Sequence, residues 1–105
     1  MSYIVKTTLG RYVDANDWQE TQSDTIRRVL FDAGSSPLNP SNDGVELTPL
    51  CNATGLSPAD VQALCDELAH NREVEKTTTG RYRLTSHGRV TVRNILARGP
   101  FDGVM

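Results

Sequence analysis

The 105-residue sequence contains no run of 18 apolar residues and only two cysteines, Cys51 and Cys65. Because a helix needs about 20 apolar residues to cross a bilayer, we expect no membrane span. No charged stretch followed by an apolar one opens the chain, so we expect no secretion signal. Two cysteines are too few for a disulfide scaffold and fit a reducing, cytoplasmic setting.

The sequence also lacks the usual motifs of catalysis and metal binding. Cys51, Cys65, His70 and His87 form neither a C-x₂-C nor an H-x₃-H unit, so we expect no metal site. No glycine-rich phosphate loop and no paired-carboxylate signature is present. We therefore expect no enzyme and no cofactor. The two cysteines are interpreted as small core side chains, and a redox pair is open only if their Cα atoms lie within about 7 Å.

Charge is divided unevenly along the chain. The net charge is −2, but residues 1–69 carry −6 and residues 70–105 carry +4. A nucleic-acid binder usually has a basic excess, which the average does not show. Electric fields act locally, within about 10 Å at 0.1 M salt, so the basic C-terminal third keeps nucleic acid open as a partner. A solvated surface of mixed sign is the alternative interpretation.

In the N-terminal part, residues 3–13 predict two short strands around a turn at Gly10. A helix is expected from an N-cap at Ser23, with Asp24 in its first turn, to Gly34. Trp18 is expected to anchor the preceding segment to the core. Residues 35–44 are turn-forming residues apart from Leu38 and predict a loop.

Downstream, a short helix over residues 47–53 is expected to end at Gly55, followed by a helix capped by Ser57 with Pro58 at its first position. Residues 74–76 and 81–85 predict a hairpin around 77–80, and Thr85 or Ser86 begins a last helix. We expect one domain over residues 1–105. It comprises an N-terminal β extension (1–22), a core (23–98) and a loose tail (99–105).

The order of these elements resembles that of a known protein family. Residues 45–57 (VELTPLCNATGLS) resemble the second helix and turn of bacterial and archaeal winged-helix regulators. Val61, Leu64 and Leu68 match the buried positions of their recognition helix, and residues 82–88 (YRLTSHG) resemble their wing strand. Over residues 23–98, the resemblance implies an α+β winged helix-turn-helix fold. Its parts are a three-helix core, a C-terminal β-hairpin wing, an extra C-terminal helix and an N-terminal β segment.

The resemblance further implies a small protein that binds double-stranded DNA and regulates transcription. The helix from Ser57 would enter the major groove and the wing would contact phosphates. The implied DNA-binding residues are Ser57, Pro58, Ala59, Gln62 and Ala63 on the helix, and Lys76, Thr77, Thr78, Thr79, Arg81 and Arg83 on the wing.

Two further partners follow from these considerations. A homodimer is expected because one helix reads one half-site; its interface would be the last helix or the N-terminal strand. The alternative function is a winged-helix module that binds protein instead of DNA. Asp66 and Glu67 would repel phosphate if they faced it, so their presence on the DNA-facing surface would favour that alternative.

Finally, residues 6–12 (KTTLGRY) recur as residues 76–82 (KTTTGRY), with Leu9 replaced by Thr79 as the one difference. One hypothesis is a second basic hairpin, with Lys6 and Arg11 gripping DNA beside the wing. The other is shared turn chemistry, with Tyr12 and Tyr82 packed on the core.

Overall fold

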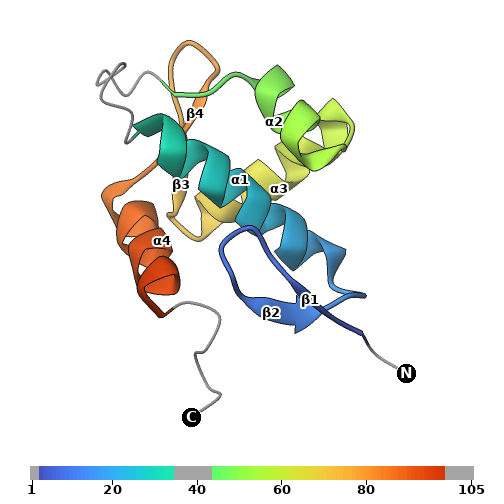
Figure 1. Ribbon diagram of the computed structural model, residues 1–105. Coiled ribbons are helices and arrows are strands. Elements are labelled where there is room, and N and C mark those ends of the chain that lie inside the picture. Colours follow the sequence, from blue (N-terminus) through green and yellow to red (C-terminus); the bar gives the residue numbers. More distant parts are fainter. Residues whose placement is uncertain (1–2, 35–43, 99–105) are drawn as a thin grey trace.

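Four helices and two antiparallel hairpins make up residues 3–34 and 44–98, the part of the chain that the computed structural model describes (Figure 1). The predicted tail (99–105) and residues 35–43 of the predicted loop lie outside the described residues. The elements are β1 (Ile4–Lys6), β2 (Tyr12–Asp14), α1 (Trp18–Gly34), α2 (Leu47–Thr54), α3 (Pro58–His70), β3 (Val74–Lys76), β4 (Tyr82–Leu84) and α4 (Ser86–Arg98). The chain is therefore a small α+β domain, which confirms the predicted fold class as far as α+β.

The helix α1 is the centre of the fold, since it packs against α2, α3, α4 and both β2 and β4. Figure 1 shows α2 and α3 to one side of it and α4 to the other. The four helices, both strands of the C-terminal hairpin and the turn between β1 and β2 contribute apolar side chains to one continuous core. This core consists of Leu9, Ile26, Leu30, Leu50, Val61, Leu64, Cys65, Leu68, Val74, Tyr82, Leu84 and Val92. None of the helices in the described ranges has the length and apolar character needed to cross a membrane.

The predicted start of α1 is wrong. The helix begins at Trp18, five residues before Ser23, because Asp17 provides the cap: its Oδ1 accepts a hydrogen bond of 3.2 Å from the backbone N–H of Glu20. Ser23 and Asp24 consequently lie inside the helix and are buried. Trp18 is 47% exposed, so it does not anchor the segment in the core as predicted.

The predicted α2–α3 connection is confirmed in detail. Gly55 has φ 75°, a left-handed conformation that favours glycine, and its N–H donates to the Cys51 carbonyl. Ser57 caps α3 by accepting a hydrogen bond of 3.3 Å from the Asp60 N–H, with Pro58 as the first helical residue. These local devices orient α3 relative to α2.

The C-terminal hairpin and α4 are joined by close backbone contacts. Val45 pairs with Tyr82 of β4 in an isolated antiparallel β-bridge, so a third backbone segment lies beside the β3–β4 hairpin. Thr85, one of the two predicted caps, accepts a hydrogen bond from the Gly88 N–H and donates one to the Arg72 carbonyl. A Cβ on Gly88 would lie 2.0 Å from the Glu73 carbonyl oxygen, so α4 can approach the hairpin only with glycine there.

Candidate nucleic-acid interface

The helix residues that are predicted to contact DNA bases lie together on the solvent-exposed side of α3. Ser57, Pro58, Ala59, Gln62 and Ala63 are all exposed. The opposite side of the helix carries the buried Val61, Leu64, Cys65 and Leu68. Four of these five side chains are small and all five are uncharged, but the exposed Asp60 stands among them in the first turn of the helix.

Three acidic residues, Asp60, Asp66 and Glu67, are also exposed on α3. Asp66 follows Gln62 by four positions and Ala63 by three, so it continues the same helical face toward the C-terminus. Asp60, in the first turn, lies beside the Ser57 cap. The exposed side of α3 therefore carries one acidic residue near its start and two toward its C-terminus, and these carboxylates favour the protein-binding alternative.

The second group of predicted residues forms the β3–β4 hairpin, whose turn projects from the body of the molecule (Figure 1). At the turn, Thr77 N–H donates to the Arg81 carbonyl at 2.7 Å and Thr77 Oγ1 accepts from the Arg81 N–H at 3.1 Å. Lys76, Thr78 and Thr79 are exposed. A hollow of about 610 Å³ lies beside this turn, lined by Glu75, Lys76, Thr77, Thr78, Thr79, Arg81 and Arg83. Hydroxyl groups and cations are the side chains that contact phosphate oxygens in DNA complexes.

Both hairpin arginines are in ion pairs on the surface. Arg81 Nη2 lies 3.1 Å from Glu46 Oε1, just before α2, and Arg83 Nε lies 2.6 Å from Glu75 Oε1 across the two strands. All four side chains are more than a third exposed. Exposed pairs of this kind contribute about 0–1 kcal/mol, so a phosphate can displace the carboxylate at little cost.

The second basic hairpin is not supported by the position of Arg11. Its guanidinium donates to Asp24 at 2.7 and 2.8 Å and also to Glu20, so it points into α1 rather than toward solvent. These hydrogen bonds, to Asp24 above all, raise the pKa of Arg11 despite the opposing effect of burial. Only Lys6 of the two predicted cations remains exposed.

The two related heptapeptides do form the same turn. Thr7 repeats the Thr77 bonds, with its N–H donating to the Arg11 carbonyl at 2.8 Å, and Gly10 has φ 85° where Gly80 has 83°. The tyrosine prediction is half wrong, because Tyr82 is buried whereas Tyr12 is 56% exposed. The first hairpin is instead held by its tip, since Leu9 is buried in the core.

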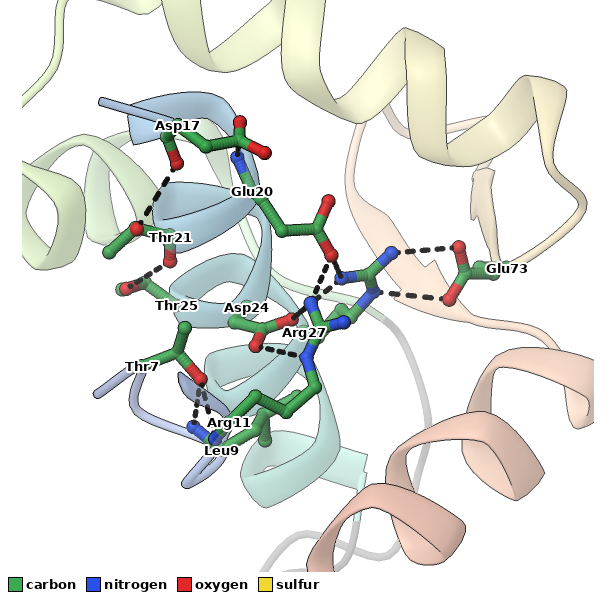
Figure 2. A network of polar contacts seen from close by, with 10 residues as sticks. All are labelled: Thr7, Leu9, Arg11, Asp17, Glu20, Thr21, Asp24, Thr25, Arg27 and Glu73. Carbon is green, nitrogen blue, oxygen red and sulfur yellow. Dashed lines mark hydrogen bonds and ion pairs between the residues drawn. The ribbon is translucent and has the colours of Figure 1, made fainter. Parts of the chain in front are cut away.

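Sequence reasoning missed a buried network of charges, shown in Figure 2. Asp24, fully buried, accepts hydrogen bonds from Arg11 and from Arg27 Nη1, the latter at 2.6 Å. Arg27 in turn donates two hydrogen bonds to Glu73, at 3.1 and 3.0 Å. Burial lowers the pKa of Arg27, but the bonds to Glu73 and Asp24 more than offset this and raise it overall. The Asp24–Arg27 spacing of three residues was the one local signal for this network.

The remaining chemistry-bearing side chains are separate from these groups. Cys51 and Cys65 are free thiols; Cys65 is buried and Cys51 half-buried, which confirms their core positions. Desolvation, with smaller contributions from Asp66 and Cys51, raises the pKa of Cys65 to about 12. No three His, Cys, Asp or Glu side chains within residues 3–34 and 44–98 are grouped so that they could hold a metal ion.

Comparisons of this chain with protein families, with curated proteins and with solved structures found no match.

Proposed function

We propose that the chain is a winged-helix domain that binds double-stranded DNA and acts in the cytoplasm as a transcription regulator. The order α1, Val45 bridge, α2, α3, β3–β4 and α4 supports the winged-helix assignment, because Val45 pairs with the hairpin at the point where the chain enters α2. The observation that carries the function is the projecting β3–β4 turn. Its exposed Lys76 and Thr78 border a hollow that Arg81 and Arg83 also line.

The acidic residues of α3 restrict how the domain can approach DNA. Asp66 lies nine residues after Ser57, which corresponds to about 13 Å along a helix axis. The major groove is about 8.5 Å deep. A helix that enters the groove by its N-terminal end therefore keeps Asp66 and Glu67 outside it, while Ala59 and Gln62 approach the bases and Ala63, about 9 Å from Ser57, lies at the groove edge. Asp60 is the one acidic residue of α3 within this depth. Gln62 can then make a bidentate contact to adenine, and the alanines can contact thymine methyl groups.

A gel-shift titration of the full chain on random-sequence duplex DNA tests this function. At about 50 mM salt, where phosphate contacts are strongest, we expect a complex. K76A and R81A should each weaken binding and flatten the dependence of log K on log salt by about 0.9 per lost phosphate contact. R28A is the matched control. It also removes an exposed arginine that is ion-paired, here with Asp32 on α1, but Arg28 lies outside the proposed DNA interface. A chain that gives no shift at this salt concentration does not bind DNA.

The exposure of Asp66 and Glu67 favours a second candidate, a module that binds a basic protein surface. The double variant D66N/E67Q separates the two functions. If DNA is the partner, removing two negative charges near the interface leaves affinity unchanged or raises it. If a basic protein is the partner, the chain gives no DNA shift, and the variant binds a polylysine probe more weakly than wild type or a D32N control.

A further inference from the structure

The β1–β2 hairpin presents four side chains on one of its faces, here called the outer hairpin face: Ile4, Lys6, Tyr12 and Asp14. Ile4 is opposite Asp14 and Lys6 is opposite Tyr12 in the strand register. Alternate residues of a strand share a face, so the four belong together. Val5 and Val13 form the opposite face and are half-buried.

The outer hairpin face exposes large apolar side chains to solvent. Ile4 is 63% and Tyr12 56% exposed, although both belong to a regular hairpin. A single exposed apolar residue is ordinary, but two on the same small face indicate a contact surface. Lys6 and Asp14 on the same face have no ion-pair partner in the described part of the chain; the Asp14 carboxylate accepts one hydrogen bond, from the Asn16 N–H.

The pattern of these four residues is self-complementary. Ile4 and Tyr12 occupy one diagonal of the face, and the oppositely charged Lys6 and Asp14 occupy the other. A twofold axis along the apolar diagonal places Ile4 on Ile4 and Tyr12 on Tyr12 of a second copy. The same rotation places Lys6 of each copy on Asp14 of the other. An interface between identical copies requires this kind of self-complementary patch.

We propose that the outer hairpin face is the interface of a homodimer. The proposal does not rest on DNA binding, since it uses a hairpin on α1 that is separate from α3 and from the β3–β4 turn. Two strands of three residues make a small contact, at the low end of interface sizes, below about 1,200 Å² in total. The dimer is accordingly weak, with a dissociation constant in the micromolar range.

Sedimentation velocity of the full chain at concentrations between about 10 μM and about 1 mM measures the monomer–dimer equilibrium. This concentration range resolves dissociation constants of tens to hundreds of micromolar. Two charge-reversal variants, K6E and D14K, supply the decisive experiment. In a K6E dimer both charge pairs become acid against acid, and in a D14K dimer both become base against base. Each variant alone should dimerise at least about tenfold more weakly than wild type.

Mixing the two variants provides the rescue. In a K6E–D14K heterodimer both pairs again join opposite charges, so the mixture should dimerise within about threefold of wild type. Rescue also shows that both variants are folded, which matters because Asp14 helps to order the turn at Asn16. I4S and Y12S should abolish dimerisation. Y3S is the matched control, since Tyr3 is 71% exposed but alternates to the opposite face from Ile4.

Three results would overturn the proposal. A wild-type chain that stays monomeric at the highest concentration has no such interface. A dimer that is insensitive to K6E and D14K uses another surface, such as α4. A mixture that dimerises no better than the separate variants shows that Lys6 does not face Asp14 of the second copy.

Discussion

Arg27 and Glu73 form a bidentate ion pair between α1 and the start of β3. The guanidinium donates from Nε to Oε1 at 3.1 Å and from Nη2 to Oε2 at 3.0 Å, and the two residues are 46 positions apart in sequence. Both side chains are buried, and Figure 2 shows the two contacts between them. Since Glu73 precedes the β3–β4 hairpin, this pair fixes the base of the hairpin on the central helix.

Replacing Glu73 with glutamine should lower the free energy of unfolding by about 3 kcal/mol. The substitution leaves a buried guanidinium with only part of its charge compensated, which is the costly way to break such a pair. Urea denaturation measures the loss. The control is E75Q, which removes the partner of Arg83 in an exposed pair and should cost no more than about 1 kcal/mol. If the two variants lose equal free energy of unfolding, the buried Arg27–Glu73 pair contributes no more to stability than an exposed pair.

The one difference between the two heptapeptides predicts a difference in stability. L9T makes the first heptapeptide identical to the second, but removes a side chain that is 2% exposed in the core, so we expect a loss of about 2–3 kcal/mol. T79L makes the reciprocal change at an exposed turn and should alter stability by less than about 0.5 kcal/mol. The urea midpoints of both variants provide the comparison. Similar midpoints would contradict the assignment of Leu9 as the anchor of the first hairpin.

Gly88→Ala should destabilise the protein, although alanine favours helices by about 1 kcal/mol over glycine. The added Cβ would lie 2.0 Å from the carbonyl oxygen and 2.9 Å from the carbonyl carbon of Glu73, both of them backbone atoms. We expect a loss of about 3 kcal/mol, at the upper end for an overpacked site. Thermal unfolding measures the change, with the exposed Asn94→Ala on α4 as a neutral control. A rise in melting temperature for G88A would show that α4 does not approach the hairpin this closely.

Stability should fall at alkaline pH because of Cys65, whose pKa burial raises from 9.0 to about 12. The folded protein keeps this thiol proton over a range in which the unfolded chain releases it. The stabilisation is therefore complete below pH 9 and is lost as the pH rises toward 12, by at most about 1.4 kcal/mol per pH unit. Tyr82, whose pKa burial also raises, adds to the fall. Urea denaturation of C65A across this pH range should show that its free energy of unfolding falls less steeply with pH than that of wild type. An identical pH dependence would refute the role of Cys65.

The sequence by itself determined those elements whose signals act within a few residues. Gly55 in its left-handed conformation, Ser57 as a cap and Gly10 and Gly80 in the turns were all predictable, because each satisfies a backbone requirement locally. The predicted reading side of α3 is exposed for the same reason, since its periodicity separates apolar from polar positions over only a few turns.

Only the tertiary structure decided which charged and aromatic residues are buried. Asp24 and Arg27 are polar residues on a helix and predict a solvated face, yet they are buried because Arg11 and Glu73 reach them from distant parts of the chain. Likewise, the apolar Leu9 in place of Thr79 is the one local difference at the two tips, and nothing within residues 6–12 and 76–82 indicates that the tyrosine is buried only in the second hairpin. A charge or a turn can be buried only where partners from other elements compensate its lost hydration, and the fold alone brings those partners together.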